Sequence, residues 1–261
     1  MPIVTLLTKA HNNLQLSHVD KFLKSKFEGL KITTNVVGTT PGGWIRLTVS
    51  GEDEKVALHY LNDQIGLCPI SLEHVERFSV KRGYSALESQ SKCDLYVDIG
   101  VFSPDIVHAR IPLQHLQAQL VDGRKIGFRK LSELFGFCEN LLLVIKISNI
   151  DSDRSRVEAV LAEKQIIQYR TWLNSLLDRL IIIGSSEHEV ELAVKKARLD
   201  RDVVGIQSLA FFQHVVVCKL GTDAAGLIPK IGKILRNATF TIFNPRKIME
   251  FLENSTALTF Q

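Results

Sequence analysis

The chain has 261 residues, of which 45% are hydrophobic and 23% are charged, and its formal net charge is +4. This apolar content excludes bulk disorder, and no apolar run approaches the roughly 20 residues that a membrane-spanning helix needs. Residues 1–75 contain as many acidic as basic side chains, so a polyanion is expected to meet residues 76–261 first.

Residues 1–75 predict the element order β-α-β-β-α, followed by one more short strand. The stretch 3–8 is β-rich and apolar, so we expect a first strand and no signal peptide. A helix is expected around 19–27, and two alternating strands flank the glycine-rich loop 38–43. A strand near 70–72, after the second helix, would complete the β-α-β-β-α-β pattern of a ferredoxin-like module.

Residues 76–170 break this rhythm and predict a β-barrel. Their alternating apolar residues indicate five short strands, with one longer insertion between the third and the fourth. This strand count is typical of an OB barrel. The expected strands cover 78–87, 94–101, 107–113, 141–150 and 157–161.

Residues 171–261 repeat the first pattern more completely. Strands are expected at 179–184, 203–209, 214–220 and 238–243, and a capping box of Ser186 with Glu189 predicts the start of a helix. The sequence therefore predicts an α+β fold in which an S1/OB-like five-stranded β-barrel (76–170) is flanked by two ferredoxin-like modules (1–75 and 171–261).

Three stretches of the middle segment are similar to motifs of S1 domains. Leu95-Tyr-Val-Asp-Ile-Gly100 and Ile111-Pro-Leu-Gln-His-Leu116 correspond to the second strand and the motif after it, and Ile147 to Leu161 corresponds to the closing hairpin. The segment 76–165 thus resembles an S1 domain. The resemblance implies binding of single-stranded RNA on one barrel face by aromatic, acidic and basic side chains.

Carried over by position, the S1 resemblance assigns RNA contacts to Tyr96, Asp151 and Arg156. Two positions depart from the S1 pattern, because Cys93 stands at an aromatic position and Pro112 at a histidine position. Each stacked base contributes roughly 1–3 kcal/mol, so these departures weaken the expected RNA binding and leave the expected fold unchanged.

Three other stretches resemble an archaeal family described as domain of unknown function 2110. They are Val37-Gly-Thr-Thr-Pro-Gly-Gly-Trp44, Gln117-Ala-Gln-Leu-Val-Asp-Gly123 and Cys218-Lys-Leu-Gly-Thr-Asp-Ala-Ala-Gly-Leu-Ile-Pro229. This resemblance spans nearly the whole chain. It implies an archaeal, cytoplasmic protein with no established activity.

Basic residues gather in the long insertion of the barrel segment and near its last hairpin. A basic surface with an aromatic among the cations suits phosphate contact combined with base stacking. The alternative is a solvated loop beside an ordinary helix, since Leu131 and Leu134 have helical spacing. Besides Tyr96, Asp151 and Arg156, the candidate RNA-binding residues are Arg110, Arg124, Lys125, Phe128, Arg129, Lys130 and Arg154.

The sequence patterns predict no catalytic residue, metal ligand or cofactor. The loop 38–43 joins two strands and is interpreted as a hairpin before a half-buried Trp44, and Gly221 to Gly226 is interpreted as helix capping by Thr222 or Asp223. The eight histidines show no metal-binding spacing, and the four cysteines form no CxxC pair. We therefore expect a protein that is not an enzyme.

Three functions remain open. The first is a non-catalytic RNA-associated protein that acts with the ribosome or RNA polymerase through the barrel, without a membrane partner. The second is a protein–protein adaptor that uses the same barrel without RNA, which the departures at Cys93 and Pro112 favour. The third is a small-molecule-binding regulator with its site at a junction between modules.

Overall fold

The computed structural model describes residues 3–87, 93–151 and 153–257. The chain packs as two compact units, one formed by residues 1–75 with 99–107 and the other by residues 76–98 with 108–261. The division into three modules after residues 75 and 170 stays a prediction.

The first unit contains a three-stranded antiparallel sheet and two helices. Its strand order is β1 (Ile3–Lys9), β3 (Trp44–Gly51), β2 (Ile32–Thr39), and its helices are α1 (Asn13–Lys26) and α2 (Glu54–Gln64). The loop 38–43 closes the expected β2–β3 hairpin. Trp44 is only 1% exposed, so it belongs to the core and is more deeply buried than expected.

The short strand at the end of this unit does not complete its sheet. Beside β1 the chain forms only an isolated bridge between Leu6 and Leu67, and then β4 (Ile70–Ser71) pairs in parallel with the end of β6 (Leu95–Ser103). The expected closing strand is therefore present, but it pairs with β6 instead of the first sheet, so the predicted pairing is wrong. Pro69 has no N–H to donate to a ladder, and Ile70 adopts a positive φ of 68°, so the chain leaves the sheet here.

The middle of the chain forms a closed five-stranded barrel, as predicted. The other strands are β5 (Val80–Ser85), β7 (Val107–Ile111), β8 (Leu142–Asp151) and β9 (Arg156–Leu161). They follow the order β6-β5-β8-β9-β7, and β7 pairs with β6 to close the ring. The β7–β9 pair is parallel, and the resulting order of first, second, third, fifth and fourth strand is that of an OB barrel.

Alternating side chains fill the barrel. The inward positions recur at every second residue, and their side chains are at most 1% exposed. They are Leu95, Val97 and Ile99 on β6, and Leu143 and Ile145 on β8. The insertion predicted between the third and fourth strands contains α3 (Leu113–Leu120) and α4 (Phe128–Phe135), while the 3-10 helix η1 (Leu72–His74) precedes the barrel.

The C-terminal part has the complete ferredoxin-like order. Its sheet runs β11 (Val203–Ala210), β12 (Gln213–Cys218), β10 (Arg179–Ile183), β13 (Thr239–Phe243), with antiparallel neighbours throughout. One sheet face shares a core with α6 (Glu187–Lys196) and α7 (Ala224–Gly232). The predicted capping box of Ser186 and Glu189 is confirmed, and Asp223 caps α7 through the amide N–H of Ala225.

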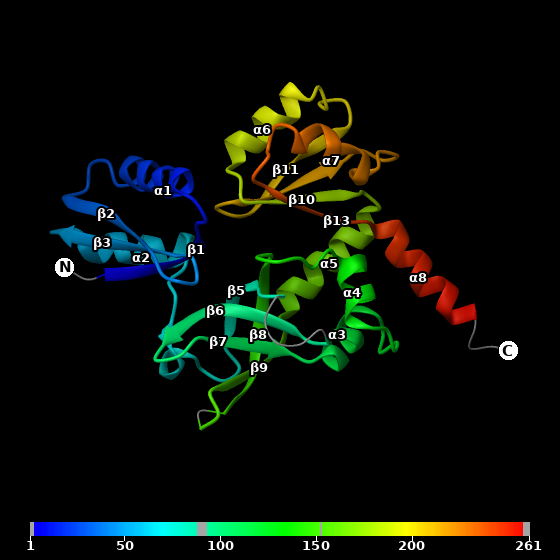
Figure 1. The fold of residues 1–261 in the computed structure, drawn as a ribbon, viewed down its shortest axis with the longest axis horizontal. Helices are drawn as coiled ribbons and strands as arrows, with labels where there is room; N and C mark the ends of the chain where they lie inside the picture. Colours follow the sequence, from blue (N-terminus) through cyan, green and yellow to red (C-terminus); the bar gives the residue numbers. More distant parts are fainter. Residues whose placement is uncertain (1–2, 88–92, 152, 258–261) are drawn as a thin grey trace. The chain divides into compact units, whose positions relative to one another are not determined.

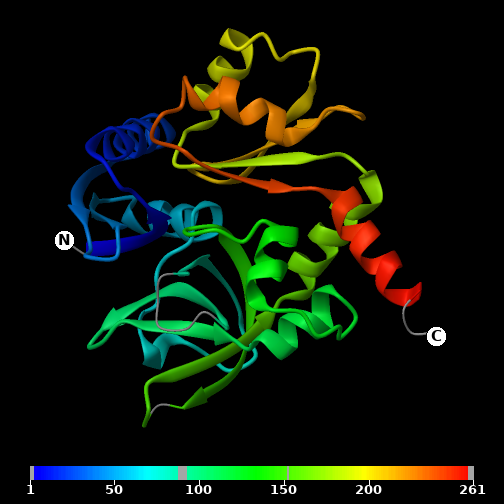
Figure 2. The same ribbon diagram turned by 45° about the vertical axis from the view of Figure 1, so that its right-hand side comes forward.

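The other face of the C-terminal sheet packs toward the barrel. Two helices, α5 (Glu163–Ser175) and α8 (Pro245–Ala257), lie on this side (Figures 1 and 2). The ring of Phe243 contacts those of Phe135, Tyr169 and Trp172 at centroid distances between 5.1 and 6.2 Å. This aromatic cluster joins α4, α5 and β13 within one unit. In the described part of the chain, no helix is long and apolar enough to cross a membrane.

Candidate nucleic-acid interface

Strand alternation places Tyr96 on the outside of the barrel. Its neighbours Leu95 and Val97 are fully buried in the barrel interior, whereas Tyr96 is half-buried. On β9, Val157 is likewise buried and Arg156 is exposed. Tyr96 and Arg156 therefore both occupy outward positions, on strands that flank β7 in the barrel. We call the outward positions of β6, β7 and β9 the charged face.

Arg110 lies on β7 in the middle of the charged face, between two carboxylates. Its Nε donates to Oδ2 of Asp94 at 2.8 Å, and its Nη1 lies 3.6 Å from Oε1 of Glu158, which is its register partner on β9. The hydrogen bond to Asp94 raises the pKa of Arg110, and the charges of Asp94, Tyr96 and Glu158 act in the same direction. Arg110 is therefore a charged guanidinium whose positive charge is compensated by two carboxylates.

A hollow of about 580 Å³ adjoins Arg110. The side chain of Lys125 reaches it from the connection between α3 and α4, which Gln117 holds in place by donating from Nε2 to the carbonyl of Ile126. Asp94 fixes the opposite wall, because its Oδ1 accepts the N–H of Leu113 at the start of α3. The hollow therefore brings two predicted RNA-binding residues, Arg110 and Lys125, to one place.

Three other predicted residues lie on the β8–β9 hairpin. Asp151 faces Arg156 in the strand register, and its Oδ1 accepts the N–H of Arg154. The Arg154 side chain is exposed and lies 3.9 Å from the Asp151 carboxylate. Figures 1 and 2 both show the β8–β9 hairpin and the α3–α4 connection at different ends of the barrel. Lys125 on the α3–α4 connection and the arginines of the β8–β9 hairpin therefore do not form one patch.

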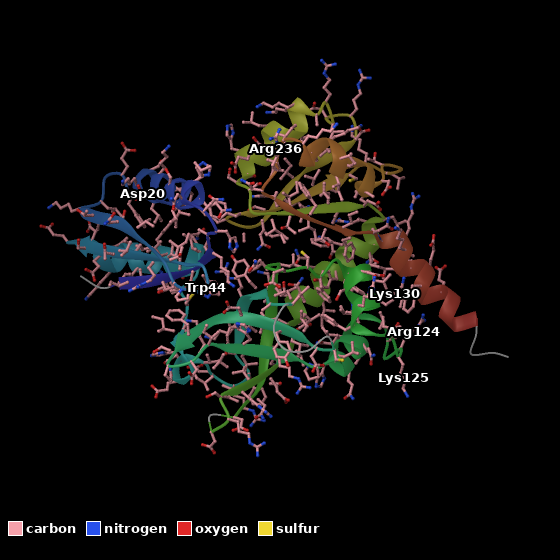
Figure 3. All side chains as sticks on the ribbon, in the orientation of Figure 1. Asp20, Trp44, Arg124, Lys125, Lys130 and Arg236 are labelled. Atoms are coloured by element: carbon pink, nitrogen blue, oxygen red, sulfur yellow. The ribbon has the colours of Figure 1, made fainter. Side chains whose placement is uncertain are left out.

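Of the remaining predicted residues, Arg124 and Lys130 lie on the side of α4 and α8 (Figure 3), and Phe128 and Arg129 belong to the first turn of α4. Arg124 donates from Nη1 to the carbonyl of Phe251 at 3.0 Å, so it anchors the α3–α4 connection to α8. Arg129 pairs with Glu133 along α4, Lys130 is exposed, and Phe128 is half-buried at the start of α4. The structure does not bring these four residues to the charged face.

Sequence reasoning missed the carboxylates that hold Arg110. Asp94 directly precedes β6 and Glu158 lies on β9, so strand alternation alone signals that both point away from the barrel interior. Their pairing with Arg110 depends on the closure of the barrel. Of the two positions that depart from the S1 pattern, Cys93 is exposed and Pro112 lies just before α3, where it lines the hollow.

Two of the three cysteines of the second unit, Cys138 and Cys218, lack the properties of nucleophiles. Burial raises the pKa of Cys218 to about 11 and that of Cys138 to about 12, so both thiols are protonated at neutral pH. The residues that the structure describes contain no group of three or more His, Cys, Asp or Glu side chains that could hold a metal ion.

Comparison with known proteins identifies one part of the chain. Residues 177–243, which include all four strands of the C-terminal sheet, match the family described as the DUF2110 C-terminal domain. This segment therefore resembles a DUF2110 C-terminal domain. The predicted resemblance to this family, which spans nearly the whole chain, is confirmed for residues 177–243. No curated protein matches the chain.

Two solved structures show distant likeness. A chain of the a/eIF2alpha–aDim2p–rRNA complex from Pyrococcus horikoshii OT3 is 11% identical, with a TM-score of 0.26 over 48% of this chain and 64% of that chain. The intact alpha subunit of aIF2 from Pyrococcus abyssi is 9% identical, with a TM-score of 0.25 over 65% of this chain and 97% of that chain.

Proposed function

We propose that this protein is a non-catalytic, RNA-associated binding protein whose barrel contacts single-stranded RNA on its charged face. The observation that carries the proposal is the OB strand order, which places Tyr96 and Arg110 on the second and third strands of the barrel. OB folds bind oligonucleotides on these two strands and on the loops beside them. The hollow with Lys125 adjoins this face.

In this proposal, the central cation of the charged face has a structural role, and the cations at its ends contact the RNA. Arg110 is held by Asp94 and Glu158, so it supports the surface and orients its neighbours. Phosphates would meet Lys125 at one end and Arg156 at the other, since both are exposed cations. A base would stack on Tyr96, an aromatic residue at an outward position of β6.

The RNA is proposed to belong to a larger complex, such as a ribosomal subunit or a transcription complex. A net charge of +4 supports only modest affinity for a free polynucleotide. Additional protein contacts would supply the rest of the binding free energy. Co-sedimentation of the tagged chain with ribosomal subunits, before and after nuclease treatment, tests this part of the proposal.

Filter binding with single-stranded RNA at two salt concentrations tests the direct contact. Tyr96→Ala should weaken binding by about fivefold to a hundredfold, which corresponds to the roughly 1–3 kcal/mol of one stacked base. Lys125→Glu and Arg156→Glu should each weaken binding at low salt, and the matching neutral variants should each lower the salt slope by about one.

The control substitution is Lys195→Glu, an exposed lysine at the end of α6 that lies on the C-terminal domain. It reverses the same charge away from the charged face and should leave RNA binding nearly unchanged. Absence of binding at low salt would contradict the proposal, as would equal losses for Lys195→Glu and Arg156→Glu.

A protein–protein adaptor is the second candidate, and one observation favours it. The central cation of the charged face is already neutralised by two carboxylates, so the surface offers hydrogen bonds to a protein as readily as to a phosphate chain. Affinity capture with and without nuclease separates the two functions. Partners that persist after RNA digestion, and that Arg156→Glu does not release, would favour the adaptor.

A further inference from the structure

The three-stranded sheet of the first unit has one edge that is closed and one that is open. The strand order is β1-β3-β2, and the segment after α2 closes the β1 edge. There the N–H of Leu7 donates to the carbonyl of Gly66, and the N–H of Cys68 donates to the carbonyl of Thr5. In the described part of the chain no strand pairs with the other side of β2 (Figure 1), so alternate residues of β2 direct their N–H and C=O groups away from β3.

The sequence of β2 lacks most of the features that protect an edge strand. Protected edges are very short or bulged, or they carry lysine, other charged residues or proline. The residues of β2, Ile-Thr-Thr-Asn-Val-Val-Gly-Thr, include no charged residue and no proline, and each is half-buried or exposed. The register with β3 shifts between Val36 and Gly38, so Ile32 to Val36 forms the regular stretch of the edge. This stretch offers its backbone groups to another strand.

The two edges of the C-terminal sheet differ from β2, because both are protected. At β13, the end of α4 packs against the backbone, since a Cβ atom on Gly136 would lie 2.9 Å from the carbonyl oxygen of Ile242. At β11, the register with β12 shifts near both ends of the strand, and such bulges disrupt further pairing. A further strand therefore fits β2 with less disturbance than it would cause at either edge of the C-terminal sheet.

The regular stretch of β2 is complementary to a second copy of itself. Two identical edge strands that pair antiparallel are related by a two-fold axis perpendicular to the sheet, and the midpoint of the stretch is Thr34. Thr34 would then lie opposite Thr34 of the second copy. Ile32 would lie opposite Val36 on the half-buried face, and Thr33 would lie opposite Asn35 on the exposed face. Apolar residues therefore meet apolar residues, and polar residues meet polar residues.

The charge of this part of the chain also favours a second copy as the occupant. Residues 1–75 contain as many acidic as basic side chains, whereas residues 76–261 carry the whole net charge of +4. A second copy that docks through residues 1–75 therefore meets no net repulsion there, and a polyanion meets no net attraction.

We propose that the chain forms a homodimer in which the β2 edges of two copies pair antiparallel about Thr34. The pairing joins two three-stranded sheets into one continuous sheet, and it provides hydrogen-bond partners for the outward backbone groups of β2. The interface uses no residue of β6, β7 or β9, which form the charged face, so the dimer is independent of the proposed RNA binding.

Sedimentation equilibrium of the full chain, at loading concentrations that reach about 1 mM, tests the dimer. Because the paired stretch is short, we expect a reversible equilibrium in which the fraction of dimer rises with concentration. A monomer at every concentration overturns the proposal.

Two double variants test the interface and its register. Thr33→Lys with Asn35→Lys places like charges opposite each other at exposed positions, and should raise the dissociation constant of the dimer by at least about tenfold. Thr33→Lys with Asn35→Glu places opposite charges opposite each other and should restore the dimer. The control is Asn62→Lys with Gln64→Lys, which adds the same charge at exposed positions of α2 and should dimerise like the original chain.

Each comparison has an outcome that contradicts the proposal. If the lysine pair on β2 leaves the dimer as tight as in the original chain, or if the control weakens it equally, β2 is not the interface. If the lysine–glutamate pair dimerises as weakly as the lysine pair, the antiparallel register about Thr34 is wrong. Melting temperatures close to that of the original chain establish that the variants are folded, so that lost dimerisation reports on the interface.

Discussion

On the charged face of the barrel, the outward positions of β7 and β9 include Arg110, Arg156 and Glu158, whereas on β8 they include Leu142 and Val144. The inward residues of these strands are alike, since all are apolar and buried. The outward residues differ because α5 and the C-terminal sheet cover β8 and leave the charged face open. Strand alternation therefore identifies the barrel interior, and outward composition identifies which side is covered.

The covered side should carry most of the packing energy, and Phe243→Ala tests this most strongly. Phe243 is fully buried among Phe135, Tyr169 and Trp172, so truncation should lower the free energy of unfolding by roughly 3–5 kcal/mol. Phe78→Ala is the control, because Phe78 is 61% exposed and its loss should change stability by less than about 0.5 kcal/mol. Urea unfolding measures both, and equal losses would contradict the comparison.

The polar bridge on the covered side gives the next effect. Gln213→Ala leaves the N–H of Leu142 and the carbonyl of Asn140 without their partner, which should cost about 1–3 kcal/mol. Gln207→Ala on the exposed edge strand β11 should be nearly neutral. Hydrogen exchange at the Leu142 amide should accelerate in the first variant only. Unchanged protection there would show that the bridge does not hold β8.

A pH effect should arise on the opposite face of the C-terminal sheet, where His214 of β12 faces the start of α6. Burial lowers the pKa of His214 below its ordinary value of 6.5, although the nearby Glu187 and Glu189 oppose this. The unfolded chain therefore binds a proton more readily, and stability is lost as the pH falls from about 6.5 toward the folded pKa. Denaturation at about pH 5 and about pH 8 should show this loss, and His214→Gln should reduce it. His188→Gln, an exposed control on α6, should retain it.

The charged face should give the smallest effect on stability. The Arg110 side chain is 44% exposed, and its ion pairs with Asp94 and Glu158 lie at the surface, so Arg110→Ala should cost less than about 1 kcal/mol. Asp94→Ala should cost more, because Asp94 also accepts the N–H of Leu113. Added salt should shrink the Arg110 effect. A loss for Arg110→Ala as large as that for Phe243→Ala would remove the distinction between the two faces.

The candidate site was predictable in part. Tyr96, Arg110 and Arg156 were expected on the barrel, and the structure places all three at outward positions of β6, β7 and β9. Arg124 was expected there as well, but its guanidinium binds the Phe251 carbonyl 127 residues further along the chain. No pattern near Arg124 in the sequence signals that contact. The hollow between β8, α5 and β11 was not predicted either, because its lining comes from β5, β8, α5, β10 and β11.

The sequence by itself determined the five barrel strands, the order of elements in the C-terminal domain and the capping of α6 and α7. These features depend on interactions between residues a few positions apart, or on a burial pattern repeated along one strand. Only the tertiary structure decided that Ile70 and Ser71 pair with β6, that Asp94 and Glu158 pair with Arg110, and that Arg124 binds the Phe251 carbonyl. Those contacts join distant segments, and packing selects among many partners that are equivalent in local sequence.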